Sequence, residues 1–354
     1  MPGAPTLAVT TSSLRQALRR LPKVDLHRHL EGSLRLSTMA ELVRSEGLEL
    51  PADEASLRPR VQAMPGEERT ALGFLSKFEP LRQFYRSPET IARLTREAIE
   101  DAAADGVRYL EIRFTPAALA RARHYPLAEV MDWVCEAATQ EAGLRGLKVG
   151  LIASINRHEP LEVAEEVARR SAERRLRGIV GLDLAGNEIK FQADPFSPIF
   201  AAAKQEGLGI TIHAGEWAGP EAVRHALEVM GADRVGHGVR VLEDAKVTAL
   251  ARERRTVFEV CLTSNLHSGV VRRADEHPLP SMIEAGLQVT LNTDDPGVSD
   301  TCLTDEYALA IDSLGLSLES LKGLILAGAQ GAFLPPKEKA SLEADLQAEL
   351  LRIP

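Results

Sequence analysis

The sequence contains few cysteines and no long hydrophobic run. Its three cysteines, Cys135, Cys261 and Cys302, are odd in number, far apart and form no CxxC pair. A disulfide framework is therefore not expected, and a reducing compartment is the default. No stretch approaches the 18 apolar residues that a membrane span requires. We expect a cytoplasmic protein that does not associate with membranes.

The sequence also lacks an excess of positive charge. It has 42 Lys and Arg against 51 Asp and Glu, a formal net charge of −9 over 354 residues. Binding to nucleic acid normally requires a basic face, so we expect no nucleic-acid partner. A single nucleotide or nucleoside is not excluded as a ligand. Hydrophobic residues make up 44% of the chain, an ordinary value for a protein with a sizeable core.

Short β-branched runs alternate with helical patterns along the whole chain. We expect eight strands, at residues 23–29, 106–114, 147–155, 179–186, 208–216, 234–239, 256–265 and 287–295. Buried strands that alternate with helices indicate parallel βαβ units, and eight units predict a (β/α)8 TIM barrel. A doubly wound open sheet would show a GxGxxG turn after its first strand, and "HLEGSLR" is not one.

No repeat, low-complexity tract or linker divides the chain, so we expect one domain over residues 1–354 with a barrel core at about 21–335. Residues 12–21 predict a first helix with a serine cap. The long interval between the first two strands predicts extra helices inserted after strand 1. Within it, residues 73–85 supply apolar side chains for a lid or pocket wall, although packing on the barrel exterior fits the pattern equally well.

Polar residues gather at the C-terminal ends of the expected strands, whereas the strand bodies look apolar. Each residue alone has an ordinary structural explanation, such as a turn or a hydrogen-bonded core histidine. Barrel enzymes build their sites at this end, from several strands at once. The residues concerned are His27, His29, Gly186, His213, Glu216, His237, Asp294 and Asp295.

The pattern of these residues predicts a metal site. His27 and His29 share one strand face, because strand side chains repeat every two residues. Three imidazoles and one carboxylate, from His27, His29, His213 and Asp294, suit one zinc ion with an open position for water, although iron, cobalt or manganese could substitute. Glu216 is placed to act as the acid or base. His237 and Asp295 remain as polar partners of the nucleophile or substrate.

A second metal would need a bridging lysine or glutamate at the end of strand 4. That strand ends in "DLAGNE", where Glu188 is only a weak candidate. We therefore expect one metal ion per chain.

Six motifs together resemble the adenosine deaminase family of the amidohydrolase superfamily. They are "PKVDLHRHLEGSL", "DLAGNE", "HAGEWAGPEAV", "VGHGVR", "CLTSN" and "NTDDPGV", in this order over nearly the whole chain. The resemblance implies zinc bound by the four ligands named above and a purine nucleoside or nucleobase as the small-molecule partner. It implies hydrolytic replacement of a purine 6-amino group by oxygen, with release of ammonia.

The resemblance also implies roles around the substrate. Glu216 would protonate ring N1, and His237 would orient the hydroxide nucleophile. Asp295 would contact the hydroxide and accept a hydrogen bond from N7, and Gly186 would offer its backbone N–H to N3. His29, Glu31, Gly186 and Asp295 would together contact the substrate.

One departure from the family pattern affects the expected substrate. Adenosine deaminases usually carry "HLDG", in which the aspartate contacts the ribose 5′-hydroxyl, whereas this chain has Glu31 in "HLEG". Adenosine stays the first choice. Adenine and 6-aminodeoxyfutalosine, an intermediate of one menaquinone route, stay as alternatives.

Two other classes remain open at this stage. A metal-dependent phosphoesterase or amidase would need basic residues near the strand ends, for which Arg113, Arg157 and His158 are candidates; surface or substrate-tail contacts fit them better. A barrel that binds a nucleoside without catalysis would be expected to have lost its acid/base, and Glu216 is present. The sequence does not predict the oligomeric state.

Overall fold

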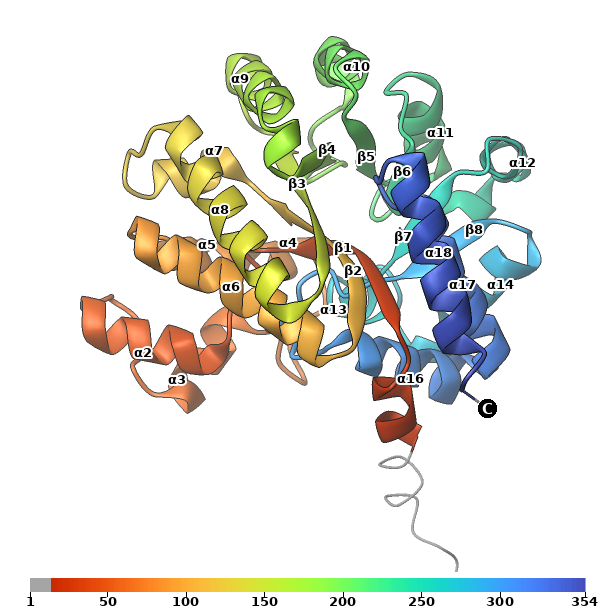
Figure 1. Ribbon diagram of the computed structural model, residues 1–354, viewed down its shortest axis with the longest axis horizontal. Coiled ribbons are helices and arrows are strands. Elements are labelled where there is room, and N and C mark those ends of the chain that lie inside the picture. Colours follow the sequence, from red (N-terminus) through yellow and green to blue (C-terminus); the bar gives the residue numbers. More distant parts are fainter. Residues whose placement is uncertain (1–13, 354) are drawn as a thin grey trace, which may run out of the picture.

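The computed structural model describes residues 14–353, which form a parallel eight-stranded barrel surrounded by helices (Figure 1). The strands follow one another around the sheet in chain order. They are β1 (Lys23–His29), β2 (Val107–Phe114), β3 (Lys148–Asn156), β4 (Ile179–Ala185), β5 (Gly209–Ala214), β6 (Arg234–His237), β7 (Val257–Val260) and β8 (Gln288–Leu291). The predicted TIM barrel is confirmed.

All eight predicted strands are present, but several predicted ranges run past the observed strand ends, most of all those of β7 and β8. Strand β7 ends at Val260, and residues Leu262–His267 form helix α13 instead. Strand β8 ends at Leu291, and three residues later Asp294 forms an isolated bridge with Arg28 of β1. In both places the predicted range included polar residues that follow the apolar run, "TSN" after β7 and "NTDD" after β8, so the range overestimates the strand.

Helices connect successive strands and cover the outside of the barrel. They are α2 (Leu36–Glu46), α3 (Glu54–Val61), α4 (Ala71–Ser76), α5 (Phe78–Leu81), α6 (Pro88–Ala104), α7 (Pro116–Arg121), α8 (Leu127–Arg145), α9 (Leu161–Glu173), α10 (Ser197–Gln205), α11 (Pro220–Glu228), α12 (Ala245–Glu253), α13, α14 (Leu279–Glu284), α15 (Pro296–Ser299), α16 (Leu303–Leu314), α17 (Leu318–Gly331) and α18 (Pro336–Leu350). Residues 14–19 are also helical. The predicted serine cap of that helix lies outside the described residues.

The insertion after β1 contains α2 to α5 and the short 3-10 helix η1 (Arg82–Phe84), before α6 leads into β2. Its 73–85 segment places Phe74, Leu75 and Phe78 along the cavity at the carboxyl ends of the strands. The prediction of a pocket wall is therefore confirmed for this segment.

The barrel closes between its first and last strands through a short seam. Apart from a single bridge between Arg28 and Asp294, β8 and β1 form no continuous ladder in the described chain. The backbone of Asp294 donates to His27 O at 2.7 Å and accepts from His29 N at 2.8 Å. The side chain of Asn292 accepts from Leu26 N at 2.8 Å. The residues that close the barrel thus include candidate site residues.

The interior of the barrel is charged, contrary to the expectation of apolar strand bodies. Arg234 pairs with Glu111 and, at 2.5 Å, with Glu259, and Arg113 pairs with Glu259 at 2.9 Å and with Asp183 at 3.5 Å. All five side chains are buried. Such charges are tolerated inside a protein because each has an opposite partner.

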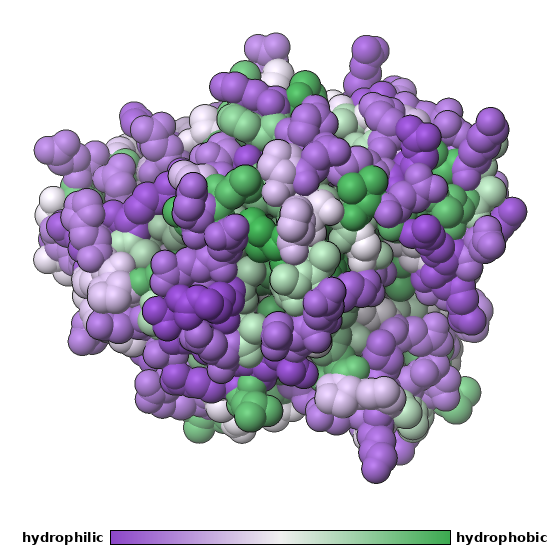
Figure 2. Space-filling view, turned by 90° about the horizontal axis from the view of Figure 1, so that it is seen from above, coloured by the Kyte–Doolittle hydropathy of each residue, from purple (hydrophilic) through white to green (hydrophobic). Residues whose placement is uncertain are grey.

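The surface is mainly hydrophilic, and on the face shown in Figure 2 apolar side chains appear chiefly near its centre. Within residues 14–353, none of the helices has both the length and the apolar character needed to cross a bilayer.

Candidate functional site

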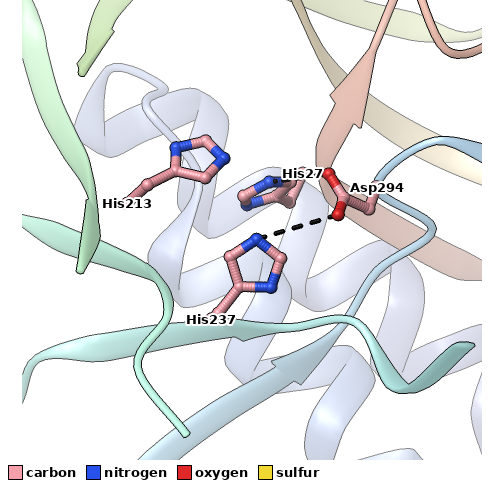
Figure 3. A group of neighbouring side chains, drawn as sticks. All are labelled: His27, His213, His237 and Asp294. Carbon is pink, nitrogen blue, oxygen red and sulfur yellow. Dashed lines mark ion pairs between the residues drawn. The ribbon is translucent and has the colours of Figure 1, made fainter. Parts of the chain in front are cut away.

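Four side chains from three separate strand ends converge at the carboxyl end of the barrel. His27 and His29 come from β1, His213 from β5, and Asp294 from the segment after β8. Nε2 of His27 lies 3.2 Å from Asp294 Oδ1, and Nε2 of His29 lies 3.4 Å from the same oxygen and 3.3 Å from His213 Nε2. Figure 3 shows three of these residues together with His237. The structure therefore brings together all four predicted ligands.

Buried carboxylates fix the orientation of two of the imidazoles. Nδ1 of His27 lies 2.8 Å from Glu259 Oε2, and Nδ1 of His213 lies 2.8 Å from Asp183 Oδ1. Although burial opposes it, neighbouring cationic and histidine side chains lower the pKa of both carboxyls below the ordinary range, so both accept hydrogen bonds. Each Nδ1 therefore carries the proton, and each Nε2 directs a lone pair to the centre.

His237 contacts the same cluster but presents a hydrogen rather than a lone pair. The backbone N–H of Leu279 donates to His277 Nδ1 at 3.1 Å, so His277 Nε2 carries a proton and donates to Asn265 Oδ1 at 3.1 Å. The amide of Asn265 then donates to His237 Nδ1 at 3.2 Å. Because burial lowers the pKa of His237 well below its usual value, the ring is neutral, and its single proton lies on Nε2.

The donor set fits one transition-metal ion. The ring nitrogens of His27, His213 and His237 and a carboxylate oxygen of Asp294 lie within 4.8 Å of one another. The proton on His237 Nε2 argues against its being a ligand, and Nε2 of His29 lies at the distances given above from Asp294 and His213. Within the described chain, Nε2 of His27 is buried and makes no hydrogen bond. A buried lone pair without a donor is the feature that a cation would satisfy.

Glu216 lies beside this cluster, in a loop whose backbone is bound by the side chain of Glu188. Oε2 of Glu216 is 3.8 Å from His237 Nε2. The backbone of residues 215–218 donates four N–H bonds, of 2.6 to 2.9 Å, to the carboxylate of Glu188. Burial, reinforced by the charges of Asp294 and Glu188, raises the pKa of Glu216 well above its usual value. The raised pKa favours the neutral form of the Glu216 carboxyl, which can deliver a proton.

Asp295 and Glu31 face the same cavity with one free oxygen each. Burial and the charge of Asp294 raise the pKa of Asp295 well above its usual value, and its Oδ1 makes no hydrogen bond within residues 14–353. Glu31 accepts the N–H of Thr115 at 2.7 Å through Oε1, and its buried Oε2 is likewise without a partner there. Gly32 lets Asp295 approach, since a Cβ at that position would lie 1.8 Å from Asp295 Oδ1.

A cavity of about 220 Å³ joins these residues. It is lined by every predicted site residue except the fully buried His27: His29, Glu31, Gly186, His213, Glu216, His237, Asp294 and Asp295. His237 and Asp294 are two of the five non-glycine residues of the described chain with positive φ, each at 58°. Such strain is retained mostly at functional sites.

The model of the adenosine deaminase family matches residues 22–349. The chain belongs to this family. A curated relative, adenosine deaminase from Shigella flexneri, is 36% identical over 333 residues, which cover 93% of this chain and 98% of that protein. Membership of this family agrees with the barrel fold and identifies the protein as a deaminase-family hydrolase, and the cluster of histidines and aspartate agrees with a bound metal ion.

Solved structures of similar proteins differ in what they act on. Adenine deaminase from Arthrobacter aurescens has a TM-score of 0.85 at 27% identity, covering 93% of this chain and 98% of that chain. An amidohydrolase from Burkhoderia ambifaria with bound Zn has a TM-score of 0.87 at 25% identity, covering 100% and 95%. N6-methyl-AMP deaminase from Arabidopsis thaliana has a TM-score of 0.80 at 29% identity, covering 94% and 98%. The chain is thus similar to deaminases of a base and of a nucleotide.

Sequence reasoning missed the residues that position this site. Asp183 and Glu259 orient two histidines, and the signal for them was a single charge within the apolar runs "GLDLA" and "VFEV". Glu188 was considered only as a second-metal ligand, yet its carboxylate is occupied by backbone N–H groups. Asn265 lies in the motif "CLTSN" but was given no role, and His277 was not singled out, because the roles of both depend on contacts between separate segments.

The three basic residues that the sequence analysis named near the strand ends have different positions in the structure. The expectation of a surface or substrate-tail role was wrong for Arg113, which is buried inside the barrel and pairs with Glu259. Arg157 is buried and donates to His213 O at 2.6 Å, so it supports the end of β5. His158 lines the cavity and stays a candidate for contact with the substrate tail.

Proposed function

We propose that this chain is a zinc-dependent hydrolase that removes the 6-amino group of an adenosine-type purine nucleoside and releases ammonia. The observation that carries the proposal is the neutral carboxyl of Glu216 beside the cluster of three imidazoles and one carboxylate. That arrangement suits the addition of water to an aromatic ring whose nitrogen must be protonated at the same time.

His27, His29, His213 and Asp294 would hold the zinc ion. Zinc lowers the pKa of water from about 15.7 to about 7 and so supplies hydroxide at neutral pH. His237, with its proton on Nε2, would donate a hydrogen bond to the oxygen nucleophile and orient it toward C6 of the purine. Asn265 keeps that proton on Nε2, because its amide donates a hydrogen bond to Nδ1 of the same ring.

Glu216 would donate its proton to N1, which makes C6 more electrophilic. Asp295 would hold N7, but in the opposite sense to the sequence-based expectation: N7 of neutral adenine carries no hydrogen, so the neutral carboxyl that the raised pKa favours donates the bond. The backbone N–H of Gly186, which lines the cavity, would bind N3. Glu31, also on the cavity wall, would face the sugar.

The first experiment is ammonia release by the zinc-loaded protein with adenosine, adenine and 6-aminodeoxyfutalosine compared side by side. Turnover of a nucleoside well above that of adenine supports the proposal. Turnover of adenine alone would show that the substrate is a base and not a nucleoside. No ammonia from any of the three compounds would reject an adenosine-type substrate.

Glu216→Gln tests the role of the acid. The substitution preserves shape but removes the transferable proton, so we expect zinc content to be unchanged and kcat to fall by about 10²- to 10⁴-fold. In the parent protein, kcat/KM should decline on the alkaline side as Glu216 loses its proton, above the range of an ordinary carboxyl. A near-parental rate in the variant would exclude Glu216 as the proton donor.

A further inference from the structure

A second cavity continues outward from the candidate active site and is lined by arginines. We call it the arginine cleft; its volume is about 530 Å³ and its lining residues are Arg82, Gln83, Arg86, Ala118, Arg121, Ala122, Arg123 and His158. No aspartate or glutamate is among them. The chain as a whole carries a net charge of −9, so four arginines along one cleft are not a reflection of composition.

The arginine cleft adjoins the active-site cavity. Arg82, Ala118 and His158 line both, whereas none of the candidate metal ligands lines the cleft. The cleft therefore borders the cavity on the side of these three residues, away from the candidate metal ligands. Of the four arginines only Arg82 is among the residues that line the active-site cavity, so a ligand that extends from the cavity into the cleft would meet Arg82 at the boundary.

Part of the positive charge in the cleft has no counter-ion. Arg121 pairs with Glu159, and Arg86 pairs with Glu46 at 3.2 Å. Arg82 and Arg123 form no ion pair with any of residues 14–353, and both are exposed. Burial lowers the pKa of His158, so the charge comes from the arginines. Two guanidinium groups in the lining of the cleft without an ion-pair partner among residues 14–353 are suited to an anion with several oxygens.

We propose that the arginine cleft binds an anionic group carried on the substrate at the end remote from its 6-amino group, that is, a phosphate or carboxylate attached through the 5′ carbon of the nucleoside. The inference rests on the proposed function for the position of the purine, and it adds the substrate class: a negatively charged 5′-substituted nucleoside rather than adenosine itself. Phosphate and carboxylate share the chemistry that the guanidinium groups recognise, and the test separates them.

The test compares four substrates with the zinc-loaded protein. Adenosine has no extension, 5′-methylthioadenosine has a neutral one, adenosine 5′-monophosphate has a phosphate, and a 5′-carboxyalkylthioadenosine has a carboxylate. We expect kcat/KM for at least one anionic substrate to exceed that for both neutral ones by about tenfold or more, with the advantage decreasing as salt increases. The anion that gives the larger ratio identifies the source.

Variants assign the effect to the cleft. Arg123→Gln and Arg82→Gln should each lower the ratio of kcat/KM for the preferred anionic substrate to that for adenosine by about tenfold. Arg60→Gln, an exposed arginine of α3 away from the cleft, removes the same charge and should keep the parental ratio. Parental ratios in both Arg123→Gln and Arg82→Gln would overturn the proposal while leaving deamination of adenosine intact.

A binding measurement keeps the two proposals separate. Calorimetry with the 6-oxo products inosine and inosine 5′-monophosphate does not require turnover. Tighter binding of the monophosphate that is lost in Arg123→Gln would support the arginine cleft for phosphate even if no substrate were deaminated. Equal affinity for the two products, together with no preference for the carboxylate substrate, would overturn it.

Discussion

At the scale of single residues, the site depends on which nitrogen of each histidine carries the proton. Carboxylates leave the Nε2 lone pairs of His27 and His213 free, whereas an amide donor forces the proton of His237 onto Nε2. Three rings of the same type thus acquire two different roles. The difference lies in the group behind each ring, not in the ring itself.

Asn265→Asp tests this assignment. Aspartate has the shape of asparagine but can only accept at His237 Nδ1, so it moves the ring proton away from the nucleophile. We expect kcat to fall by about 10²-fold or more with zinc content unchanged, since general acid–base contributions have this size. Asn265→Ala removes the donor without imposing the wrong tautomer, and its loss should be smaller. If the alanine variant proved worse than the aspartate variant, Asn265 would have a packing role only.

At the scale of elements, the loop after β5 is positioned by a side chain from the loop after β4. The carboxylate of Glu188 replaces the missing partners of four consecutive backbone N–H groups, at residues 215–218. A buried backbone N–H without an acceptor costs about 1–3 kcal/mol, so the carboxylate of Glu188 stabilises this conformation of the loop strongly. Glu216 is part of the loop, so its position depends on Glu188.

Glu188→Gln should disturb this loop selectively. The amide of glutamine offers one acceptor oxygen and directs its N–H₂ at a backbone donor. We expect kcat to fall by about tenfold or more, because small displacements of catalytic groups are costly, while zinc content stays unchanged. Glu206→Gln, an exposed glutamate after α10, should behave as the parent. An unchanged kcat in Glu188→Gln would show that the loop holds Glu216 without this contact.

Elements were more predictable from the sequence than the contacts between them. Strand positions follow from apolar β-branched runs, and their order follows from the short connections of parallel units. The catalytic and ligand candidates could be named because they lie at the ends of those runs or just after them. The roles of Asn265, His277 and Glu188 could not be assigned, because each depends on a contact between separate segments that no local pattern specifies.

At the scale of the whole molecule, the candidate metal site lies on the seam of the barrel. His27 and His29 belong to the first strand, Asp294 follows the last, and the backbones of these segments bond only briefly. A metal ion held by these side chains would link the two ends of the sheet. Its binding free energy would then add to the stability of the closed barrel.

Removal of the metal ion should therefore destabilise the contact between β1 and the segment after β8 more than the rest of the barrel. With free zinc at 1,000 times its dissociation constant, binding contributes about 4 kcal/mol, so we expect chelation to lower Tm by several degrees. Amide hydrogen exchange should increase in β1 and in the segment after β8, with β3 and β4 as internal controls. A uniform increase over all strands, or none, would contradict a local link at the seam.

The charged interior has a consequence for how this barrel can be rearranged. Arg234 on β6 meets partners on β2 and β7, and Arg113 on β2 meets partners on β4 and β7. If any of these strands slid by one residue, its inward charge would turn outward and leave the opposite charge alone in the interior, at a cost of about 3–5 kcal/mol. The ion pairs therefore fix the register of these strands. A strand grafted from another barrel would have to carry a matching charge at the same position in the register, however well its apolar residues fitted.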